Sequence, residues 1–291
     1  MIAVDLVTVP YDSGRRGYRM GAGPQALLRD GLVQKLRASG RDVELVPVET
    51  SGTVKDDLST AFDLAARVGR VTRASRSAGR FPLTISGNCF STVGAFACVA
   101  DEPAGVLWLD AHGDLHTPDT TESGFLDGMA AATLVGWCHA DRTRGIPSVI
   151  LAESALMLVG ARDFDSGESA ALKQSAVTLL SPAGTIDPAT RTTALRSFAA
   201  PLKMIYLHVD LDVLDPEQVG RANEFASPGG LSLNHVVDVL TAAGAILPIA
   251  GMTISAYDPA MDATGAVRRS ASDIITAVLQ AADARPGSSV P

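Results

Sequence analysis

Short aliphatic and β-branched runs alternate with helical stretches along almost the whole chain, and this alternation limits the fold more than any other feature. Eight runs are typical of strands, at residues 2–9, 43–48, 82–86, 105–110, 155–161, 176–181, 203–210 and 250–257. Seven further stretches have apolar residues at helical spacing, at 24–38, 56–76, 90–100, 126–137, 187–199, 232–243 and 265–282. Strands that are apolar on both faces and alternate with helices form parallel sheets covered on both sides. The sequence therefore predicts a three-layer α/β/α fold with a central, mainly parallel eight-stranded sheet.

Composition and charge narrow the class of protein. The chain has 291 residues, of which 46% are hydrophobic, and we expect a single domain over 1–283 followed by a mobile tail over 284–291. Its net charge of -8 leaves no basic footprint for a nucleic acid partner. No apolar run approaches the roughly 20 residues of a membrane span, so no membrane partner is expected. The three cysteines are too few for a disulfide framework, which favours a cytoplasmic setting.

Alternating polar residues follow the strand predicted at 105–110, in the sequence LWLDAHGDLHTPDTTESG. Side chains at positions i, i+2 and i+4 of an extended chain point to one side, so Asp110, His112 and Asp114 can converge. Carboxylates and an imidazole together are typical ligands of a divalent metal ion. The alternative is structural: the aspartates cap the following turns, and His112 is a buried, hydrogen-bonded histidine.

A second acidic pair, Asp210 and Asp212 of HVDLDVLDP, lies at the end of the strand predicted at 203–210. Two buried carboxylates repel each other and lose hydration unless a cation neutralises them. Open parallel sheets bind ligands outside the carboxyl ends of their strands, so the end of strand 82–86 belongs at the same edge. Cys89 in SGNCFS lies there, where it either completes a metal site or fills space. The full set of ligands is enough for two metal ions that activate a shared water molecule.

These motifs resemble those of the arginase, agmatinase and formimidoylglutamase superfamily, the ureohydrolases. Its order and spacing are matched by the segments VPYDSGRRGYRMGAGPQALLRDGL, DAHGDLHTPDTTESG, GARDFDSGE and HVDLDVLDP. The resemblance implies a hydrolase of carbon–nitrogen bonds in linear amidines with two divalent metal ions. The implied ligands are Asp110, His112, Asp114, Asp210 and Asp212. Cys89 stands where the family has a histidine ligand and is the implied sixth one, so Zn2+ or Fe2+ are alternatives to the expected Mn2+.

The resemblance also implies catalytic roles near the metals. The carboxylate of Asp114 handles a proton of the attacking water, and Asp127 stands where arginases have a histidine proposed as a proton shuttle. His208 lies two residues before Asp210 and is expected at the same edge, where it orients a ligand or moves a proton.

Substrate contacts are implied at His116, Thr121, Ser123, Asp165 and Glu168. In arginases the hydroxyl pair holds the α-carboxylate of the substrate and the acidic pair holds its α-amino group, so an α-amino acid tail fits. The glutamate that holds the guanidinium group is replaced by Ala256. Asp258, two residues further on, is the expected substitute.

Cys89 and the non-histidine residue Asp127 also resemble the small branch of the superfamily that hydrolyses Nω-hydroxy-L-arginine to hydroxyurea and ornithine. We predict a guanidino or hydroxyguanidino amino acid substrate, which yields urea or hydroxyurea plus an amine product. The alternatives are a hydrolase of formimino amino acids and a non-catalytic, metal-binding family member that acts as a regulatory subunit. The expected partners are small amidino molecules, and a homo-oligomer is expected because the family often forms trimers or hexamers.

Overall fold

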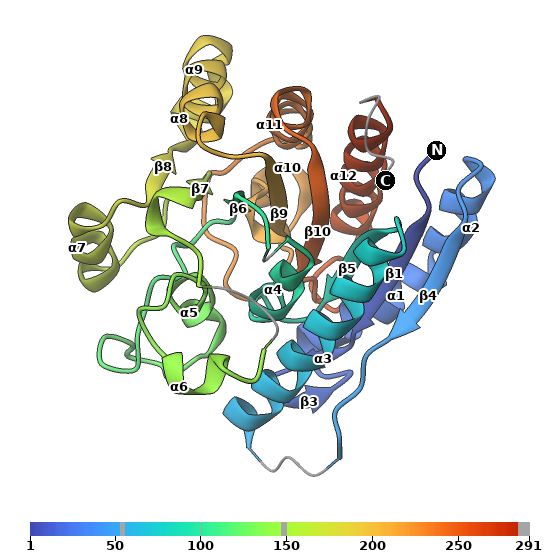
Figure 1. Cartoon of the computed structure of the whole chain (residues 1–291), viewed down its shortest axis with the longest axis horizontal. Coiled ribbons are helices and arrows are strands. Elements are labelled where there is room, and N and C mark those ends of the chain that lie inside the picture. The colour runs from blue at the N-terminus through green and yellow to red at the C-terminus, as the bar shows by residue number, and fades with distance from the viewer. Residues whose placement is uncertain (53–55, 100, 147–149, 285–291) are drawn as a thin grey trace.

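One parallel sheet organises the molecule. The structure is a computed structural model that describes residues 1–52, 56–99, 101–146 and 150–284 (Figure 1). Its large sheet has eight strands in the order β4-β1-β5-β10-β9-β6-β7-β8, and every pairing is parallel. The strands are β1 (Val4–Val9), β4 (Val43–Pro47), β5 (Phe81–Ser86), β6 (Ala104–Leu109), β7 (Leu156–Val159), β8 (Thr178–Leu180), β9 (Met204–Asp210) and β10 (Ile249–Ser255). A short antiparallel hairpin joins β2 (Tyr11–Asp12) and β3 (Arg15–Arg16). The predicted eight-stranded α/β fold is confirmed.

Helices cover both faces of this sheet. One face packs against α3 (Asp57–Ser77), α4 (Ser91–Ala95) and α5 (Ala130–Leu134), and the other against α1 (Gly23–Arg29), α2 (Leu32–Ala38), α9 (Pro188–Ala199), α11 (Leu233–Ile246) and α12 (Ala266–Asp283). The shorter helices are α6 (Ala140–Thr143), α7 (Ser166–Gln174), α8 (Pro182–Ile186) and α10 (Pro216–Val219). Single 3-10 turns lie at Arg19–Ala22, Phe96–Val99, Asp127–Met129, Glu153–Ala155 and Leu211–Val213.

The central strands are apolar on both sides because each side meets a separate hydrophobic core. In β6, Leu107 and Leu109 belong to the core under α11 and α12, whereas Val106 and Trp108 belong to the core under α3 and α4. All four side chains are fully buried. Burying a large apolar side chain stabilises the fold by about 1.5–3 kcal/mol, so the sheet centre holds the layers together.

Local sequence signals explain where the main helices begin. Asp56 caps α3 by accepting the Ser59 N–H at 2.8 Å, and Ser232 caps α11 by accepting the His235 N–H at 3.2 Å. The single helix predicted over 24–38 is wrong, because the chain breaks into α1 and α2 at Gly31. That residue has a φ of 83°, a left-handed conformation that ends one helix before the next begins.

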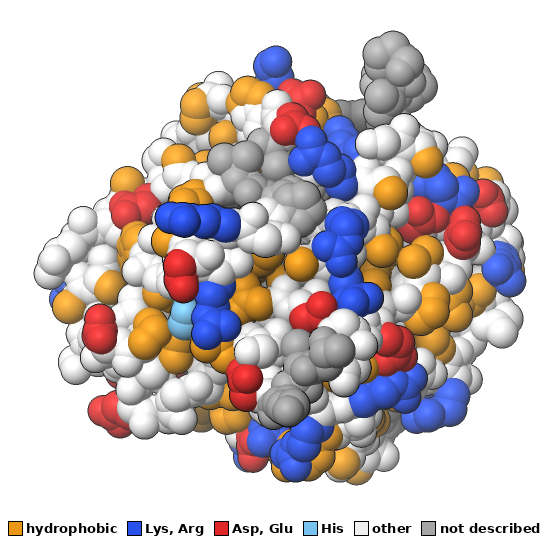
Figure 2. Space-filling view, turned by 60° about the horizontal axis from the view of Figure 1, so that its bottom comes forward, with side chains coloured by type: hydrophobic (Ala, Val, Ile, Leu, Met, Phe, Trp, Pro, Cys, Tyr) orange, Lys and Arg blue, Asp and Glu red, His pale blue; other side chains and the backbone are white. Residues whose placement is uncertain are grey.

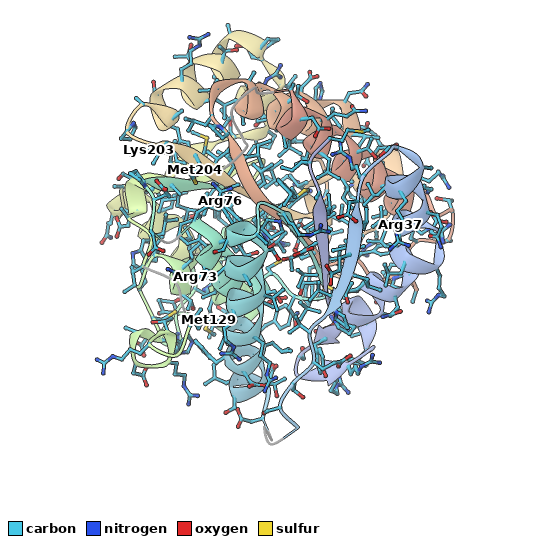
Figure 3. All side chains as sticks on the ribbon, turned by 45° about the vertical axis from the view of Figure 1, so that its right-hand side comes forward. Arg37, Arg73, Arg76, Met129, Lys203 and Met204 are labelled. Carbon is cyan, nitrogen blue, oxygen red and sulfur yellow. The ribbon has the colours of Figure 1, made fainter. Side chains whose placement is uncertain are left out.

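Helix α3 runs along the sheet from its carboxyl edge to its amino edge. At its last turn Arg76 Nη2 lies 3.5 Å from Met204 Sδ, at the start of β9 (Figure 3). Figure 2 shows basic side chains in a run across one face, with acidic side chains beside them. On α3, Arg67 pairs with Asp63 at 3.1 Å and Arg73 pairs with Asp101, so these two arginines are accompanied by carboxylates.

The remaining predictions about organisation are only partly tested. Among the described residues, no helix is both long enough and apolar enough to cross a membrane. The single domain over 1–283 stays a prediction, and the predicted tail lies, from residue 285 onward, outside the described residues.

Candidate metal centre

Three strand ends bring the predicted metal ligands together. Asp110 directly follows β6, Asp210 is the last residue of β9, and Cys89 lies in the turn between β5 and α4. In the sheet β9 pairs with β6, and β10 separates β9 from β5. Because all these strands are parallel, their carboxyl ends lie at one edge.

Cys89 is tied directly to an acidic residue of this edge. Its thiol donates to Asp210 Oδ2 at 3.0 Å, and its Sγ lies 3.3 Å from Ser255 Oγ at the end of β10. The cysteine is only 2% exposed. These contacts hold the Cys89 sulfur at the acidic edge, so the residue does more than fill space, and its role as a metal ligand stays a prediction.

Asp110, His112 and Asp212 form the second part of the cluster. His112 Nδ1 lies 3.2 Å from Asp110 Oδ1 and 3.5 Å from Asp212 Oδ2. The Trp108 indole N–H donates to Asp110 Oδ2, and the Ala111 N–H donates to Asp212 Oδ1, each at 3.2 Å. One potential ligand atom from each of the three residues lies within 4.8 Å of the others. Such donors fix the direction of the carboxylates, as hydrogen bonds behind metal ligands commonly do.

Burial and mutual repulsion penalise negative charge in this cluster. Burial and then Asp212 raise the pKa of Asp110, and the same causes raise the pKa of Asp210 well above its usual value. Burial and Asp210 likewise raise the pKa of the Cys89 thiol. Burial lowers the pKa of His112, but the hydrogen bond to Asp110 and the charge of Asp212 outweigh burial and raise the pKa to about 10. A divalent cation would relieve this repulsion more completely than one proton on an imidazole.

Two buried atoms of the cluster have no hydrogen-bond partner within the described part of the chain. They are Asp114 Oδ2 and His208 Nε2. Asp114 is 5% exposed, and burial followed by the charge of Asp110 raises its pKa well above the usual value. Leaving a buried polar atom unpaired costs about 1–3 kcal/mol. The unpaired carboxylate oxygen and the thiolate, imidazole and carboxylate donors together fit divalent cations.

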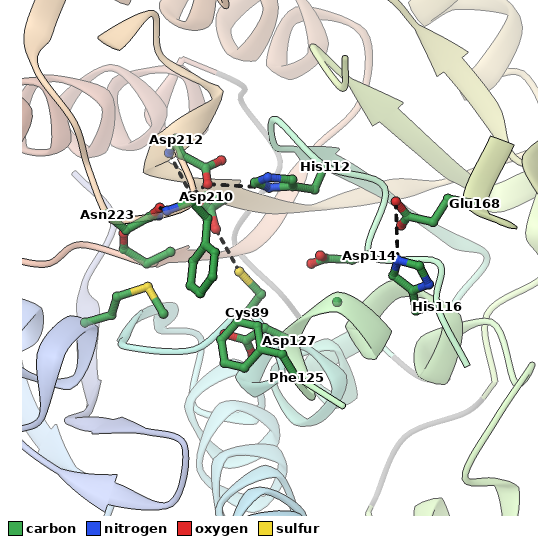
Figure 4. Close-up of a pocket in the computed structure, with 14 residues that line it drawn as sticks. Cys89, His112, Asp114, His116, Phe125, Asp127, Glu168, Asp210, Asp212 and Asn223 are labelled. Atoms are coloured by element: carbon green, nitrogen blue, oxygen red, sulfur yellow. Dashed lines mark hydrogen bonds and ion pairs between the residues drawn. The ribbon is translucent and has the colours of Figure 1, made fainter. Parts of the chain in front are cut away.

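A cavity of about 130 Å³ lies over the cluster. Its polar lining residues are Cys89, His112, Asp114, His116, Asp127, Glu168, Asp210, Asp212 and Asn223, and the rest are Met20, Phe125, Gly128, Phe225 and Ala256. Figure 4 shows Cys89 and Asp210 at one side, His116 and Glu168 at the other, and Asp114 between them. The cavity therefore joins the predicted metal ligands to predicted substrate contacts.

Asp127 reaches this cavity from the 3-10 turn before α5. It is 6% exposed, its Oδ1 accepts the Phe90 N–H at 3.1 Å, and its Oδ2 accepts the Asn88 side-chain amide. Burial raises the pKa of Asp127 to about 7, although both hydrogen bonds lower it. A carboxyl group with such a pKa can either donate or accept a proton near neutral pH.

The opposite end of the cavity holds two predicted substrate contacts, His116 and Glu168, and a third, Asp165, lies beside them. His116 Nε2 lies 3.3 Å from Asp165 Oδ2 and 3.7 Å from Glu168 Oε2. Asp165 caps α7 by accepting the Glu168 N–H at 2.8 Å, and Glu168 Oε1 accepts the Leu115 N–H at 3.0 Å. Two carboxylates therefore lie within 3.7 Å of the same imidazole nitrogen.

Thr121 and Ser123 lie on the loop beside the cavity but do not line it. Thr121 Oγ1 accepts the Gly124 N–H at 3.0 Å, and Ser123 Oγ accepts the Phe125 N–H at 3.1 Å. Both hydroxyls thus shape the loop that carries Phe125, and their contact with a substrate carboxylate stays a prediction.

Two further predicted site residues, Asp258 and His208, also do not line the cavity. Asp258 Oδ1 accepts the Ala260 N–H at 2.9 Å, and its own N–H donates to Ala222 O at 2.8 Å. Its carboxylate caps a turn, so the expected replacement of the guanidinium-binding glutamate by Asp258 lacks a geometric basis. His208 is fully buried behind the ligands and makes no direct contribution to the cavity wall.

Sequence reasoning missed Asn223 and the aromatic wall. Asn223 is 1% exposed, and its amide donates to Asp212 Oδ2 at 3.3 Å and to Ala256 O at 3.0 Å. Its Oδ1 accepts the Phe225 N–H at 2.8 Å. Phe225 stacks on Phe125 with ring centroids 5.1 Å apart. The sequence signal for Asn223, Phe225 and Phe125 was their position in the segments that follow the motifs HVDLDVLDP and DAHGDLHTPDTTESG.

Comparisons with known proteins identify the family of the chain and similar folds. The sequence matches the family model described as the arginase family over residues 2–280. The arginase of Brevibacillus brevis is 31% identical over 231 residues, which cover 73% of this chain and 76% of that protein. The arginase structure of Bacillus caldovelox superposes with a TM-score of 0.83 at 23% identity, over 96% of this chain and 98% of the other. The formimidoylglutamase structure of Bacillus subtilis superposes with a TM-score of 0.77 at 17% identity, over 98% and 88%.

The family match extends over nearly the whole chain, so it includes every strand end that forms the cluster. The predicted ureohydrolase resemblance and the predicted enzyme class are confirmed. This chain belongs to the arginase family and is a hydrolase that acts on carbon–nitrogen bonds in linear amidines.

Proposed function

We propose that this enzyme hydrolyses a guanidino or hydroxyguanidino amino acid and prefers the hydroxyguanidino form, releasing hydroxyurea and an amine. The observation that carries the proposal is Ala256 in the cavity wall, with Met20 in the same apolar cluster. A guanidinium group carries a full positive charge, and its desolvation is costly without a carboxylate partner. A hydroxyguanidine is less basic and can enter uncharged, so it tolerates a methyl group at that position.

The proposal includes two divalent cations, with Mn2+ expected and Zn2+ or Fe2+ as alternatives because of the cysteine. The proposed ligands are Cys89, Asp110, His112, Asp114, Asp210 and Asp212. Bound cations would supply Lewis-acid activation of a water molecule near neutral pH. The unpaired Asp114 Oδ2 and the raised pKa values of the buried carboxylates support this assignment.

The side chains of the cavity provide the remaining chemistry. Asp114 Oδ2 takes up the proton of the attacking water. Asp127, whose pKa lies at about 7, donates a proton to the departing amine. At the far end, Glu168 and Asp165 bind the α-ammonium group of the substrate, with His116 beside them.

The test compares L-arginine with Nω-hydroxy-L-arginine in the wild type and in Ala256→Glu, each loaded with Mn2+. Urea, hydroxyurea and ornithine are measured, and a formimino amino acid is included in the panel. We expect the wild type to favour hydroxyarginine, and we expect the new carboxylate to raise kcat/KM for arginine by about 10-fold or more, because it pairs with the guanidinium.

Ala260→Glu is the matched control, since Ala260 is exposed on the same loop and does not line the cavity. Exclusive turnover of the formimino substrate would contradict the proposal. So would an unchanged arginine to hydroxyarginine ratio in Ala256→Glu.

A further inference from the structure

His208 is a buried histidine that cannot touch a substrate in the cavity. It lies on β9 beside Trp108 of β6, and their rings stack with centroids 3.7 Å apart and an interplanar angle of 22°. It is 0% exposed, and it is not among the residues that line the cavity. Any effect of His208 on the reaction must therefore pass through its neighbours.

The two ring nitrogens of His208 have different surroundings. Nδ1 lies 2.7 Å from Thr92 Oγ1, in α4. Nε2 has no hydrogen-bond partner among the described residues, although it is completely buried. A ring nitrogen of His208, the Cys89 sulfur and an Asp110 oxygen lie within 4.8 Å of one another. Because Nδ1 is paired with Thr92, Nε2 is the ring nitrogen that remains to interact with the inner side of the candidate metal cluster.

The surroundings determine where the ring carries its proton. The groups near the ring, Cys89 and Asp110, accept hydrogen bonds when ionised, so an N–H on the nitrogen that Thr92 leaves open, Nε2, is favoured over a lone pair there. With the proton on Nε2, Nδ1 is an acceptor, and the Thr92 hydroxyl donates to it. Thr92 is also joined to Cys89 through the backbone, since its N–H donates to Cys89 O at 2.9 Å.

We propose that Thr92 and His208 act as positioning residues for the cysteine side of the metal centre. The Thr92 hydroxyl fixes the ring of His208, which presents Nε2–H to the Cys89 sulfur and the Asp110 carboxylate. This inference rests on the proposed function only in taking Cys89 and Asp110 as metal ligands. It does not depend on which amidine is the substrate.

The test uses pairs of variants with closely similar shapes. Thr92→Val removes the hydroxyl and keeps the volume, whereas Thr92→Ser keeps the hydroxyl. His208→Met removes the ring donor, whereas His208→Gln keeps an N–H donor on a side chain of similar reach. The apo forms are compared first by circular dichroism and thermal unfolding, which identify any variant that fails to fold.

The readouts use the metal alone. Mn2+ affinity and stoichiometry are measured by equilibrium dialysis with elemental analysis, and the thiolate-to-metal absorption is recorded for the Co2+-loaded protein. We expect Mn2+ binding in Thr92→Val and His208→Met to weaken by about 10- to 100-fold, with a shifted Co2+ band. Thr92→Ser should stay close to the wild type, and His208→Gln should recover part of the loss.

The Thr92 pair decides the inference even if a His208 variant does not fold. Unchanged Mn2+ affinity and an unchanged Co2+ band in Thr92→Val would overturn it. Equal losses in Thr92→Ser and Thr92→Val would show that Thr92 only fills space, which also overturns it. Failure of every amidine to be hydrolysed would reject the proposed function, yet these metal measurements would keep their meaning.

Discussion

Cys89 brings a sulfur atom into a cluster whose other candidate ligands are carboxylates and an imidazole. It is only 2% exposed, and its thiol donates to Asp210. A thiolate is a softer ligand than a carboxylate, so it shifts the balance of affinity towards Zn2+ or Fe2+. The residue is therefore expected to influence which metal is bound.

Substituting Cys89 tests this expectation. Cys89→Ser should lower the content of bound metal and change the ratio of Zn2+ to Mn2+, because a hydroxyl is a much weaker ligand than a thiolate. Cys89→His should raise the affinity for Mn2+, since imidazole suits first-row divalent metals in general. Elemental analysis after loading with each metal gives the result.

The matched control for this pair is Cys98→Ser. Cys98 is also buried, but it lies in the 3-10 turn after α4 and does not line the cavity. Metal content and activity that stay unchanged in Cys89→Ser would show that the cysteine only packs.

The site residues differ in how far the sequence could predict them. Asp110 and Asp210 were predictable from the sequence, because alternation at a strand end sets the side to which the side chains point, and a parallel sheet places the strand ends at one edge. Asn223 was not, because it reaches Asp212 from an irregular loop whose course depends on tertiary contacts. Asp258 shows the opposite error: it is close in sequence to Ala256, but its side chain turns to the Ala260 N–H.

Among the elements, α4 connects the metal centre to the helical layer. Its Gly94 touches α3 so closely that an added Cβ would lie 2.0 Å from Ala65 O. The same short helix carries Thr92 and begins two residues after Cys89. A shift of α4 away from α3 would therefore move both residues.

Gly94→Ala should both destabilise the fold and weaken metal binding. Forcing a methyl group into this contact is expected to cost about 1–3 kcal/mol or more, because backbone atoms must move. Urea unfolding of the apo protein gives the stability, and dialysis against Mn2+ gives the affinity. Gly145→Ala is the control, because its added Cβ would meet only Arg142 O at 3.8 Å. A Gly94→Ala protein as stable as the control would contradict the close contact.

The elements themselves were predicted unequally. Strands of the sheet were found because continuous apolar runs report burial on both faces. Helices were predicted where a long apolar stripe exists, as in α3 and α12. The break at Gly31 was not predicted, because the apolar stripe over residues 24–38 continues across it. The shorter elements α7 and α8 depend on caps and on docking rather than on periodicity.

At the scale of the whole molecule, an ion pair joins segments that are far apart in sequence. Arg41 Nη2 donates to Asp283 Oδ2 at 2.6 Å, and the Ile2 N–H donates to Asp283 Oδ1 at 2.6 Å. Burial raises the pKa of Asp283, but the hydrogen bonds from Arg41 and Ile2 outweigh it, so the pKa lies below the usual 3.8. The folded state thus holds the charged form more strongly than the unfolded chain does.

Asp283→Asn should reduce the free energy of unfolding by about 1.5–3 kcal/mol at neutral pH, the range for hydrogen bonds to charged groups. Because the folded pKa is depressed, the stabilisation is present above the unfolded pKa and is lost as the pH falls through the folded value. The difference from the wild type should therefore shrink below about pH 4 in urea titrations.

Asp273→Asn, exposed on the same helix, should have little effect at any pH. A difference between wild type and Asp283→Asn that grew on acidification would contradict the assigned direction of the pKa shift.

The strand order has a consequence for how the enzyme is made. Cys89 and Asp210 are 121 residues apart, and β10, the last strand to be synthesised, lies between β5 and β9 in the sheet. At about 5–20 residues per second, the ribosome adds Asp210 roughly 6 to 24 s after Cys89. Until β10 inserts between β5 and β9, the thiol of Cys89 and the carboxylate of Asp210 lie on strands that are not yet joined in one sheet. We therefore expect the proposed cations to bind late, after synthesis of the C-terminal strand.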